Sequence, residues 1–594
     1  MLSDQTLERP DRRAAGLDAT LWTVLALTAA GLRLAALAAA PLNGREAEQA
    51  LAAFQAAQGT VSDAAAHISP LLFHLNTLLF FIGDGGEAMA RLIPALAGVG
   101  LTLTPLFLRR YLGRWGALGT GLLLALSPSA LFASRTLDGT MPAALGVMVL
   151  VGCAAAFLDR WRLGLVTAGA LGLAVALTAG AAGWGLLLGL LIALGIGLWM
   201  WREQVGWLWP LLRPALGRGA AMTGLGVLAL GSGLGLHPAG LAAVGEQLLD
   251  WLARFRAPAT PAVAPLPILL AYEPLILVFG LAGAVVASRR QHTAGLLLAF
   301  WAAIGALQVA LMPSRQPADL LWLLLPLAGL AGLAIEALVN SLLTHGRWLN
   351  EGLYLPISLI LWAHGGLALA HYAHSDDPVS LILAGLTILL QLVLLAAFGF
   401  AVTVPTVEES MEWLLQQGSG VMLRAGTLSL AAVLLAITIS TGWGLAYLRP
   451  SDPRELPVAD PIAGEVRTLS QVARQVSAQA AAMETGLPVT FLGQPDPTVA
   501  WTLRHFEQRV VERLGDETPP LVIAPAESAL PAGYVGETFP LRRVWHPDWS
   551  GRATMLWWLY RETSAPAISG QIVLWVRDDL PPVLTTDDRP PTTP

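Results

Sequence analysis

The sequence contains no lysine, because all 35 of its basic residues are arginine. This absence excludes a Schiff-base mechanism and any site in which a lysine ammonium binds phosphate or acts as a base. A phosphate-binding site built from basic side chains must therefore use arginine or histidine.

Cysteine and charge are also scarce. Cys153 is the single cysteine, which excludes an intrachain disulfide, and its apolar sequence context favours an inert buried thiol. Only 13% of the residues are charged, against about 25% in soluble domains, and 55% are hydrophobic. The formal net charge of −6 gives no basic surplus that would indicate a nucleic-acid partner. The composition therefore predicts a membrane protein.

Long apolar runs are abundant. They predict a mainly α-helical, polytopic membrane bundle of about 13 transmembrane helices over residues 21–448. The arginines between the runs place the N-terminal tail, residues 1–20, in the cytoplasm. The first run is long enough to span and lacks a convincing cleavage site, so we do not expect a cleaved signal peptide. The expected spans lie near residues 21–40, 88–108, 115–134, 139–158, 162–178, 182–200, 220–236, 266–288, 294–312, 319–339, 352–372, 379–404 and 424–447.

One apolar run is too short to span the membrane. Residues 70–82 provide about 13 residues where a spanning helix needs about 20, which predicts an interfacial or re-entrant segment. With this assignment, the arginines of residues 109–114 lie on the cytoplasmic side. Residues 134–138 then reach the outer face, where the first outer loop, residues 41–70, also lies.

The composition changes in residues 449–580, which are charged, rich in proline and free of spanning runs. These features predict an extracytoplasmic α/β domain that we expect to be dispensable for folding of the bundle. We expect the tail, residues 581–594, to be disordered. The predicted helices of the domain cover residues 462–485 and 501–514, and its predicted strands cover residues 488–493, 521–524 and 571–577.

The first outer loop gathers ionisable groups at a membrane face, where such groups are costly and often functional. Glu46 and Glu48 are the candidate catalytic residues, because a carboxylate here can take a proton as general base. Arg45 and His67 are candidate ligands for a phosphate or substrate. The alternatives are a solvated face of an interfacial helix for the glutamates and a helix cap for His67.

Further candidates lie in later outer segments. Arg135, Asp138, Arg256 and Arg315 are candidate donor-phosphate or substrate-binding residues, since arginines on the outer face oppose the usual charge bias and suit phosphate. The alternatives are an Arg135–Asp138 ion pair, helix capping by Asp138 and interfacial snorkelling by Arg315. The role of Glu273, inside an apolar run, stays open. No closed metal-ligand pattern occurs, so no metal ligand is assigned and the need for a divalent metal stays open.

Four motifs follow one another in order. They are Asn43-Gly44-Arg45-Glu46-Ala47; His67-Ile68-Ser69-Pro70; the spaced series Gly83, Glu87, Arg91 and Pro94; and Leu126-Ser127-Pro128 through Ser134-Arg135 to Asp138. In this order they resemble the GT-C type polyprenyl-phosphate-sugar-dependent glycosyltransferases, which include protein O-mannosyltransferases and the lipid A aminoarabinose transferase. The resemblance covers about residues 20–340. Residues 501–504 and 573–577 look like the C-terminal extension of a bacterial and archaeal branch of these transferases.

The resemblance implies a multi-pass protein of the bacterial plasma membrane with its cavity and C-terminal domain on the outer side. Its donor is a sugar on a polyprenyl phosphate, and its acceptor is a glycan, lipid or protein. The acceptor attacks with inversion, a loop carboxylate takes its proton, and arginines hold the phosphate leaving group. The other expected partners are membrane lipids.

Arg45 departs from the pattern, since the family has an aspartate at this position. Either Glu46 or Glu48 has taken over the role of the base, or the chain binds without reacting, as a scaffold subunit. A transporter or flippase of lipid-linked glycans is a third alternative. The lack of repeated halves and of paired interrupted helices in the sequence speaks against it.

Overall fold

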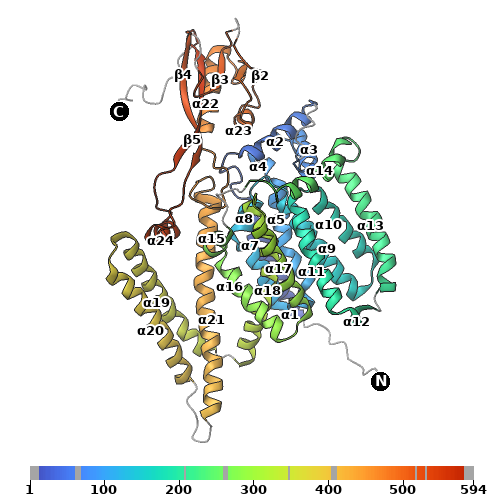
Figure 1. Cartoon of the computed structure of the whole chain (residues 1–594), viewed down its shortest axis with the longest axis vertical. Coiled ribbons are helices and arrows are strands. Elements are labelled where there is room, and N and C mark those ends of the chain that lie inside the picture. Colours follow the sequence, from blue (N-terminus) through green and yellow to red (C-terminus); the bar gives the residue numbers. More distant parts are fainter. Residues whose placement is uncertain are drawn as a thin grey trace.

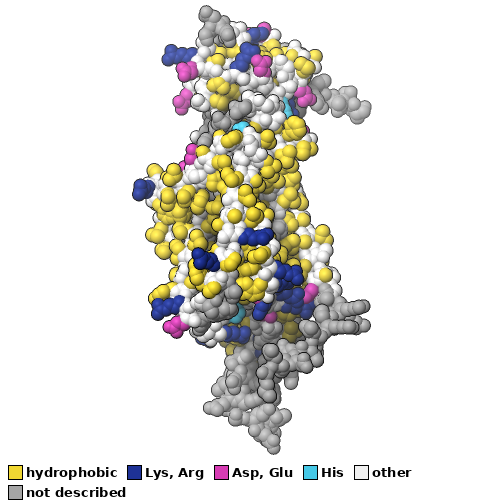
Figure 2. All heavy atoms as spheres, turned by 90° about the vertical axis from the view of Figure 1, so that its right-hand side faces the viewer, with side chains coloured by type: hydrophobic (Ala, Val, Ile, Leu, Met, Phe, Trp, Pro, Cys, Tyr) yellow, Lys and Arg dark blue, Asp and Glu magenta, His cyan; other side chains and the backbone are white. Residues whose placement is uncertain are grey.

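The computed structural model describes residues 12–60, 68–206, 209–258, 265–345, 348–402, 411–514, 518–528 and 532–580. The chain forms a helical bundle with a small sheet domain at one end, and α19, α20 and α21 lie together at one side of the bundle (Figure 1). On the face shown in Figure 2, hydrophobic side chains cover most of the middle of the molecule, with a few basic side chains among them, and other charged side chains lie toward the two ends. The predicted tail, residues 581–594, lies outside the described residues.

The bundle contains most of the helices. In chain order they are α1 (Arg12–Leu34), α2 (Gly44–Ala57), α3 (Pro70–Ile82), α4 (Glu87–Ala90), α5 (Leu92–Leu103), α6 (Arg109–Leu112), α7 (Arg114–Leu126), α8 (Pro128–Ser134), α9 (Thr140–Arg160), α10 (Leu163–Thr178), α11 (Ala181–Met200), α12 (Arg202–Val205), α13 (Trp209–Gly231), α14 (Ala239–Ala253), α15 (Pro265–Tyr272), α16 (Pro274–Arg289), α17 (Thr293–Leu311), α18 (Leu321–His345), α19 (Trp348–Ser375), α20 (Pro378–Val402) and α21 (Met411–Trp443).

The spans agree with the predicted multi-pass bundle. Among the described residues, nine helices are long and apolar enough to cross a membrane, and there are eleven spans if each of two bent helix pairs counts as one. This is fewer than the predicted 13 or so. The two remaining predicted spans, 162–178 and 220–236, fall on α10 and α13, which are not among the eleven. As predicted, α3 is an apolar helix too short to be one of these spans.

Two spans are broken, and each break occurs next to a proline. Helices α7 and α8 meet at Ser127-Pro128 with a bend of 61°, and α15 and α16 meet at Glu273-Pro274 with a bend of 96°. Proline cannot donate the helical hydrogen bond and disfavours a helical conformation in the residue before it. The first break matters for the site, because α8 leads directly to Arg135 and Asp138.

The C-terminal domain is a five-stranded mixed sheet in the order β2-β1-β3-β5-β4. The strand β1 pairs in parallel with β2 and β3, whereas β5 is antiparallel to both β3 and β4. Buried residues of α22 and α23 complete its core. The elements are α22 (Glu465–Ala481), β1 (Val489–Leu492), α23 (Pro497–Thr502), β2 (Gln508–Val511), β3 (Leu521–Pro525), β4 (Tyr534–Val544), α24 (Gly551–Tyr560) and β5 (Ala567–Arg577).

Two details of this domain differ from the sequence-based prediction. The predicted helix over 501–514 is wrong: α23 begins earlier, after Asp496 accepts a hydrogen bond from Thr498 N at 2.9 Å, and ends at Thr502. The next residues form β2, where two valines favour a strand. The longest antiparallel pairing, between β4 and β5, involves a β4 that was not predicted, since Pro540 interrupts its pattern.

The domain is joined to the bundle by shared apolar packing and buried polar contacts. Trp501 is buried in one cluster with first-loop residues, and its ring centre lies 6.2 Å from that of Phe54 on α2. The Tyr272 hydroxyl of the bundle donates to the buried Glu455 at 2.5 Å, and Arg561 of α24 donates to the same carboxylate at 3.0 Å. This integration argues against the expectation that the bundle folds without the domain.

Candidate functional site

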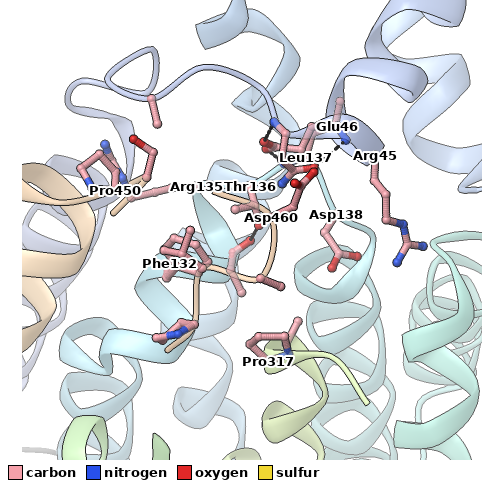
Figure 3. Close-up of a pocket in the computed structure, with 18 of the residues that line it drawn as sticks. Arg45, Glu46, Phe132, Arg135, Thr136, Leu137, Asp138, Pro317, Pro450 and Asp460 are labelled. Carbon is pink, nitrogen blue, oxygen red and sulfur yellow. Dashed lines mark hydrogen bonds between the residues drawn. The ribbon is translucent and has the colours of Figure 1, made fainter. Parts of the chain in front are cut away.

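A cavity of about 310 Å³ opens where residues 37–49, the α8–α9 junction, residues 315–318 and the segment leading into the C-terminal domain meet. Five of the predicted site residues line it, and Figure 3 labels four of them, Arg45, Glu46, Arg135 and Asp138, around the same cavity. The five come from three separate parts of the sequence: Arg45, Glu46, Arg135, Asp138 and Arg315.

The other three predicted residues do not join this group in the structure. Glu48 lies on α2 two residues after Glu46, and its exposed side chain is not part of the cavity wall. Arg256 follows α14 and is exposed, again away from the cavity wall. His67 falls outside the described residues.

Glu46 is buried, with 3% of its surface exposed, and its carboxylate is fully engaged. It forms a capping box at the start of α2, in which it accepts a hydrogen bond from Asn43 N at 3.0 Å. Arg91 donates to both of its oxygens, at 2.9 and 2.8 Å, and Leu137 N donates at 2.6 Å. The carboxylate therefore ties α2 to α5 and to the α8–α9 junction.

Arg91 belongs to one of the sequence motifs, but no role was predicted for it. Burial lowers the pKa of its guanidinium, and the Glu46 carboxylate more than offsets this effect, so the pKa is raised overall. Arg91 also donates to the carbonyls of Leu37, Ala40 and Pro41 at 2.8–3.0 Å. It thus holds both α2 and the chain that precedes it.

Arg135 is also buried and also bonds to backbone. Its guanidinium donates to Ala35 O at 2.5 Å and to Ala36 O at 2.7 Å, just beyond the end of α1. It lies over the ring of Tyr447 at 4.6 Å, which is a cation–π contact. The predicted Arg135–Asp138 ion pair, one of the alternatives from the sequence, is not among the ion pairs of the described residues.

Two of these five residues carry a carboxylate, Glu46 and Asp138. Asp138 is the one that is partly exposed, and it lines the cavity. Its Oδ1 accepts a hydrogen bond at 3.1 Å from the N–H of Thr140, the first residue of α9, although the N-cap residue of this helix is Gly139. Among the described residues no other donor binds it. Asp138 therefore combines a fixed backbone position with an oxygen that faces the cavity.

Two further arginines, Arg45 and Arg315, line the cavity. Arg45 is exposed at the start of α2 and points into the hollow (Figure 3). Arg315 donates to Met312 O at 3.3 Å, and its loop is fixed by a capping box between Gln316 and Asp319. Guanidinium groups in such positions can form paired hydrogen bonds with a phosphate.

One cavity residue comes from a region with no predicted site. Asp460 precedes α22, and its Oδ2 accepts from Gly44 N at 3.0 Å although the two residues are 416 positions apart. Arg542 of β4 donates to its other oxygen at 2.9 Å. No pattern in the sequence connects these residues, because only the folded domain brings them together. Within the described residues, no three His, Cys, Asp or Glu side chains are grouped as a metal site would require.

The fold is that of a known class of membrane enzymes. Two structures of ArnT from Cupriavidus metallidurans share it. The form bound to undecaprenyl phosphate matches with a TM-score of 0.54 and 15% identity, over 94% of this chain and 97% of that chain. The apo form matches with a TM-score of 0.53 and 16% identity, over 95% and 99%. The sequence matches no family model and no curated protein sequence.

A third structure is more distant. The oligosaccharyltransferase AglB from Archaeoglobus fulgidus, in complex with an inhibitory peptide and a dolichol-phosphate, matches with a TM-score of 0.45 and 12% identity, over 86% of this chain and 69% of that chain. The two ArnT matches confirm, at the level of the fold, the resemblance to GT-C type glycosyltransferases. The chain is thus a multi-pass membrane protein with the GT-C fold and a C-terminal sheet domain.

Proposed function

We propose that this protein is an inverting glycosyltransferase that moves a sugar from a polyprenyl phosphate to an acceptor on the extracytoplasmic face. The observation that carries the proposal is the cavity, in which two arginines, Arg45 and Arg315, lie with the partly exposed carboxylate of Asp138. A phosphodiester donor needs cations for its leaving group, and an incoming hydroxyl or amine needs a base. Both kinds of group are present in one cavity.

In the proposed step, Asp138 takes the proton of the acceptor while the acceptor oxygen or nitrogen bonds to the anomeric carbon. The bond from that carbon to the phosphate oxygen breaks, and the polyprenyl phosphate leaves with the electron pair. Arg45 and Arg315 stabilise the charge that develops on the phosphate. The lipid tail stays in the bilayer, next to the apolar middle of the molecule (Figure 2).

The sequence identified Glu46 and Glu48 as candidate bases, and the geometry favours Asp138 over both. Glu46 already accepts hydrogen bonds from a guanidinium and two backbone N–H groups, and Glu48 is exposed away from the cavity wall. Glu46 therefore fits the role of an anchor for α2. Phosphate binding by His67 and Arg256 remains a prediction.

The same contacts support a second candidate function, a non-catalytic scaffold with the GT-C fold. Arg45 replaces the aspartate of the family pattern, and the next acid, Glu46, is held by Arg91 at 2.8 Å. A chain with this loop binds a lipid-linked sugar without transferring it if Asp138 does not act as base.

The test is to reconstitute the purified protein in vesicles with a labelled sugar on undecaprenyl phosphate and a mixture of glycan, lipid and peptide acceptors. The transferase proposal predicts labelled acceptor and free undecaprenyl phosphate in equal amounts. Binding of the donor without product supports the scaffold. Movement of intact donor between leaflets without transfer indicates a flippase and contradicts the proposal.

A further inference from the structure

The chain that leaves α1 forms one wall of the cavity without regular secondary structure. Leu37, Ala39, Ala40 and Pro41 line the cavity directly. Ala36 adopts a left-handed conformation, with φ of +50°, which costs about 1 kcal/mol or more for a residue with a Cβ. Carbonyls outside helices and sheets take their donors from water, other backbone groups or side chains. Residues 37, 40 and 41 are buried, whereas residues 35, 36, 38 and 39 are exposed, so any side chain that binds these exposed carbonyls does so in place of water.

Arginines supply those donors. Each of the seven consecutive carbonyls of residues 35–41 accepts a hydrogen bond from an arginine. Three arginines donate these hydrogen bonds. Arg135 binds the first two, Arg91 binds those of residues 37, 40 and 41, and Arg467 binds the two in the middle. The first two arginines belong to the bundle, whereas Arg467 lies on α22 of the C-terminal domain.

The geometry of Arg467 uses the full width of the guanidinium. Its NH2 donates to Ala38 O at 2.6 Å and its NH1 donates to Ala39 O at 3.2 Å. The same NH2 pairs with Glu87 of α4 at 2.5 Å, which fixes the side chain from a second direction. A lysine has a single nitrogen and cannot reproduce this fork.

We propose that Arg467 is a positioning residue, through which the C-terminal domain sets the shape of the cavity wall that precedes α2. It does not touch the reacting groups. It fixes residues 38 and 39, and these precede the helix that carries Arg45 and Glu46. The kinetic part of this inference rests on the proposed transferase function, and the structural part does not.

The experiment compares wild type, Arg467→Ala, Arg467→Lys and the control Arg577→Ala in the full-length protein. Arg577 is in the same domain, and its contacts to Asp579 and Thr518 stay within it. The first measurement is hydrogen–deuterium exchange of the amides of residues 35–46. In Arg467→Ala we expect these amides to exchange at least about tenfold faster than in wild type, because two charge-assisted hydrogen bonds are lost. In Arg577→Ala we expect their exchange rates to equal those of wild type.

Arg467→Lys keeps the positive charge and the attraction to Glu87 but loses the paired hydrogen bonds to the carbonyls of residues 38 and 39. It therefore distinguishes the effect of these hydrogen bonds from the effect of the charge. We expect it to exchange faster than wild type as well, and it also tests the inference if the alanine variant does not fold. The second measurement is sugar transfer per folded protein, where we expect kcat to fall about tenfold in Arg467→Ala.

Exchange at the wild-type rate in Arg467→Ala overturns the inference, and so does full retention of slow exchange in Arg467→Lys. Faster exchange in both variants with a wild type that transfers no sugar upholds the structural role and rejects the transferase function. Faster exchange with unchanged kcat overturns the kinetic part alone.

Discussion

At the scale of single residues, Glu46 and Asp138 show how two acids in one cavity differ in what they can do. Glu46 is paired with the buried Arg91 and bonded to the backbone on both sides of the cavity. Asp138 is bonded to one N–H and is partly exposed. A base must accept a proton at an oxygen that the acceptor can reach, and this requirement favours Asp138.

The Glu46–Arg91 pair leads to a stability prediction. In Glu46→Gln the buried guanidinium of Arg91 loses its counter-charge, so we expect the free energy of unfolding to fall by about 3 kcal/mol or more. Thermal unfolding in detergent of this variant and of Asp138→Asn measures the effect, and Asp138→Asn should stay close to wild type. Equal stability of Glu46→Gln and wild type would show that Glu46 is not an anchor. A loss of activity in this variant must therefore be corrected for folding.

Part of this site was accessible from the sequence. The sequence placed five residues on one face because charged residues at span ends are few, and these five line one cavity: Arg45, Glu46, Arg135, Asp138 and Arg315. The burial of Glu46 was not predictable, since its partner is 45 residues away, and Asp460 is 416 residues from Gly44. Such contacts depend on packing between helices that no local pattern encodes.

At the scale of elements, the break between α7 and α8 is held by two buried ionisable side chains, those of Arg33 and Glu273. Arg33 of α1 donates to the carbonyls of Leu124 and Ala125 at the end of α7, at 2.8 and 3.2 Å. Glu273 accepts from Ser127 Oγ at 2.7 Å and from Ser129 N at 2.8 Å at the start of α8. Arg33 thus supplies donors to carbonyls at the end of α7, and Glu273 supplies an acceptor at the start of α8, where helix ends lack partners of their own.

This arrangement assigns a structural role to Glu273, which the sequence left open. In Glu273→Leu, the N–H of Ser129 and the hydroxyl of Ser127 lose their buried acceptor, so we expect a loss of about 2–4 kcal/mol in stability. Glu273→Gln keeps an acceptor oxygen and should lose about 1 kcal/mol or less. The measurement is the apparent melting temperature of each variant, which we expect to be lower for Glu273→Leu than for Glu273→Gln. The account of the break is wrong if both variants melt at the same temperature.

At the scale of the whole molecule, the sheet domain and the bundle form one unit around the cavity. Asp460 caps the start of α2, and Leu456, Trp545 and Trp557 belong to the same apolar cluster as the bundle. The expectation of a dispensable domain arose because the composition changes sharply near residue 449. Composition reports which solvent a segment faces, but not how much surface it buries against its neighbours.

Removal of residues 449–594 is therefore expected to destabilise the bundle. The truncated chain would expose the apolar surface around Phe54 and leave Tyr272 without its buried partner Glu455. We expect aggregation in size-exclusion chromatography and faster proteolysis of the first outer loop, compared with the full-length chain. A monodisperse truncated protein with an unchanged melting temperature would restore the original expectation.

The overall fold was largely predictable, and the details were not. Apolar runs located the helices of the bundle, because a spanning segment must satisfy its own backbone hydrogen bonds. Two predicted spans fall on α10 and α13, which are not among the eleven helices or bent pairs that are long and apolar enough to span, and the bends at Pro128 and Pro274 were not foreseen. In the domain, β2 and β4 were missed because β-pairing depends on distant partners more than on local propensity.

The measurement that tests the central claim most directly is sugar transfer by wild type and Asp138→Asn, each corrected for the folded fraction. The account predicts transfer by wild type with inversion at the anomeric carbon. It predicts a fall in kcat of about 100-fold or more in Asp138→Asn with donor binding retained, as expected for loss of a general base. Transfer at the wild-type rate by Asp138→Asn would contradict the account.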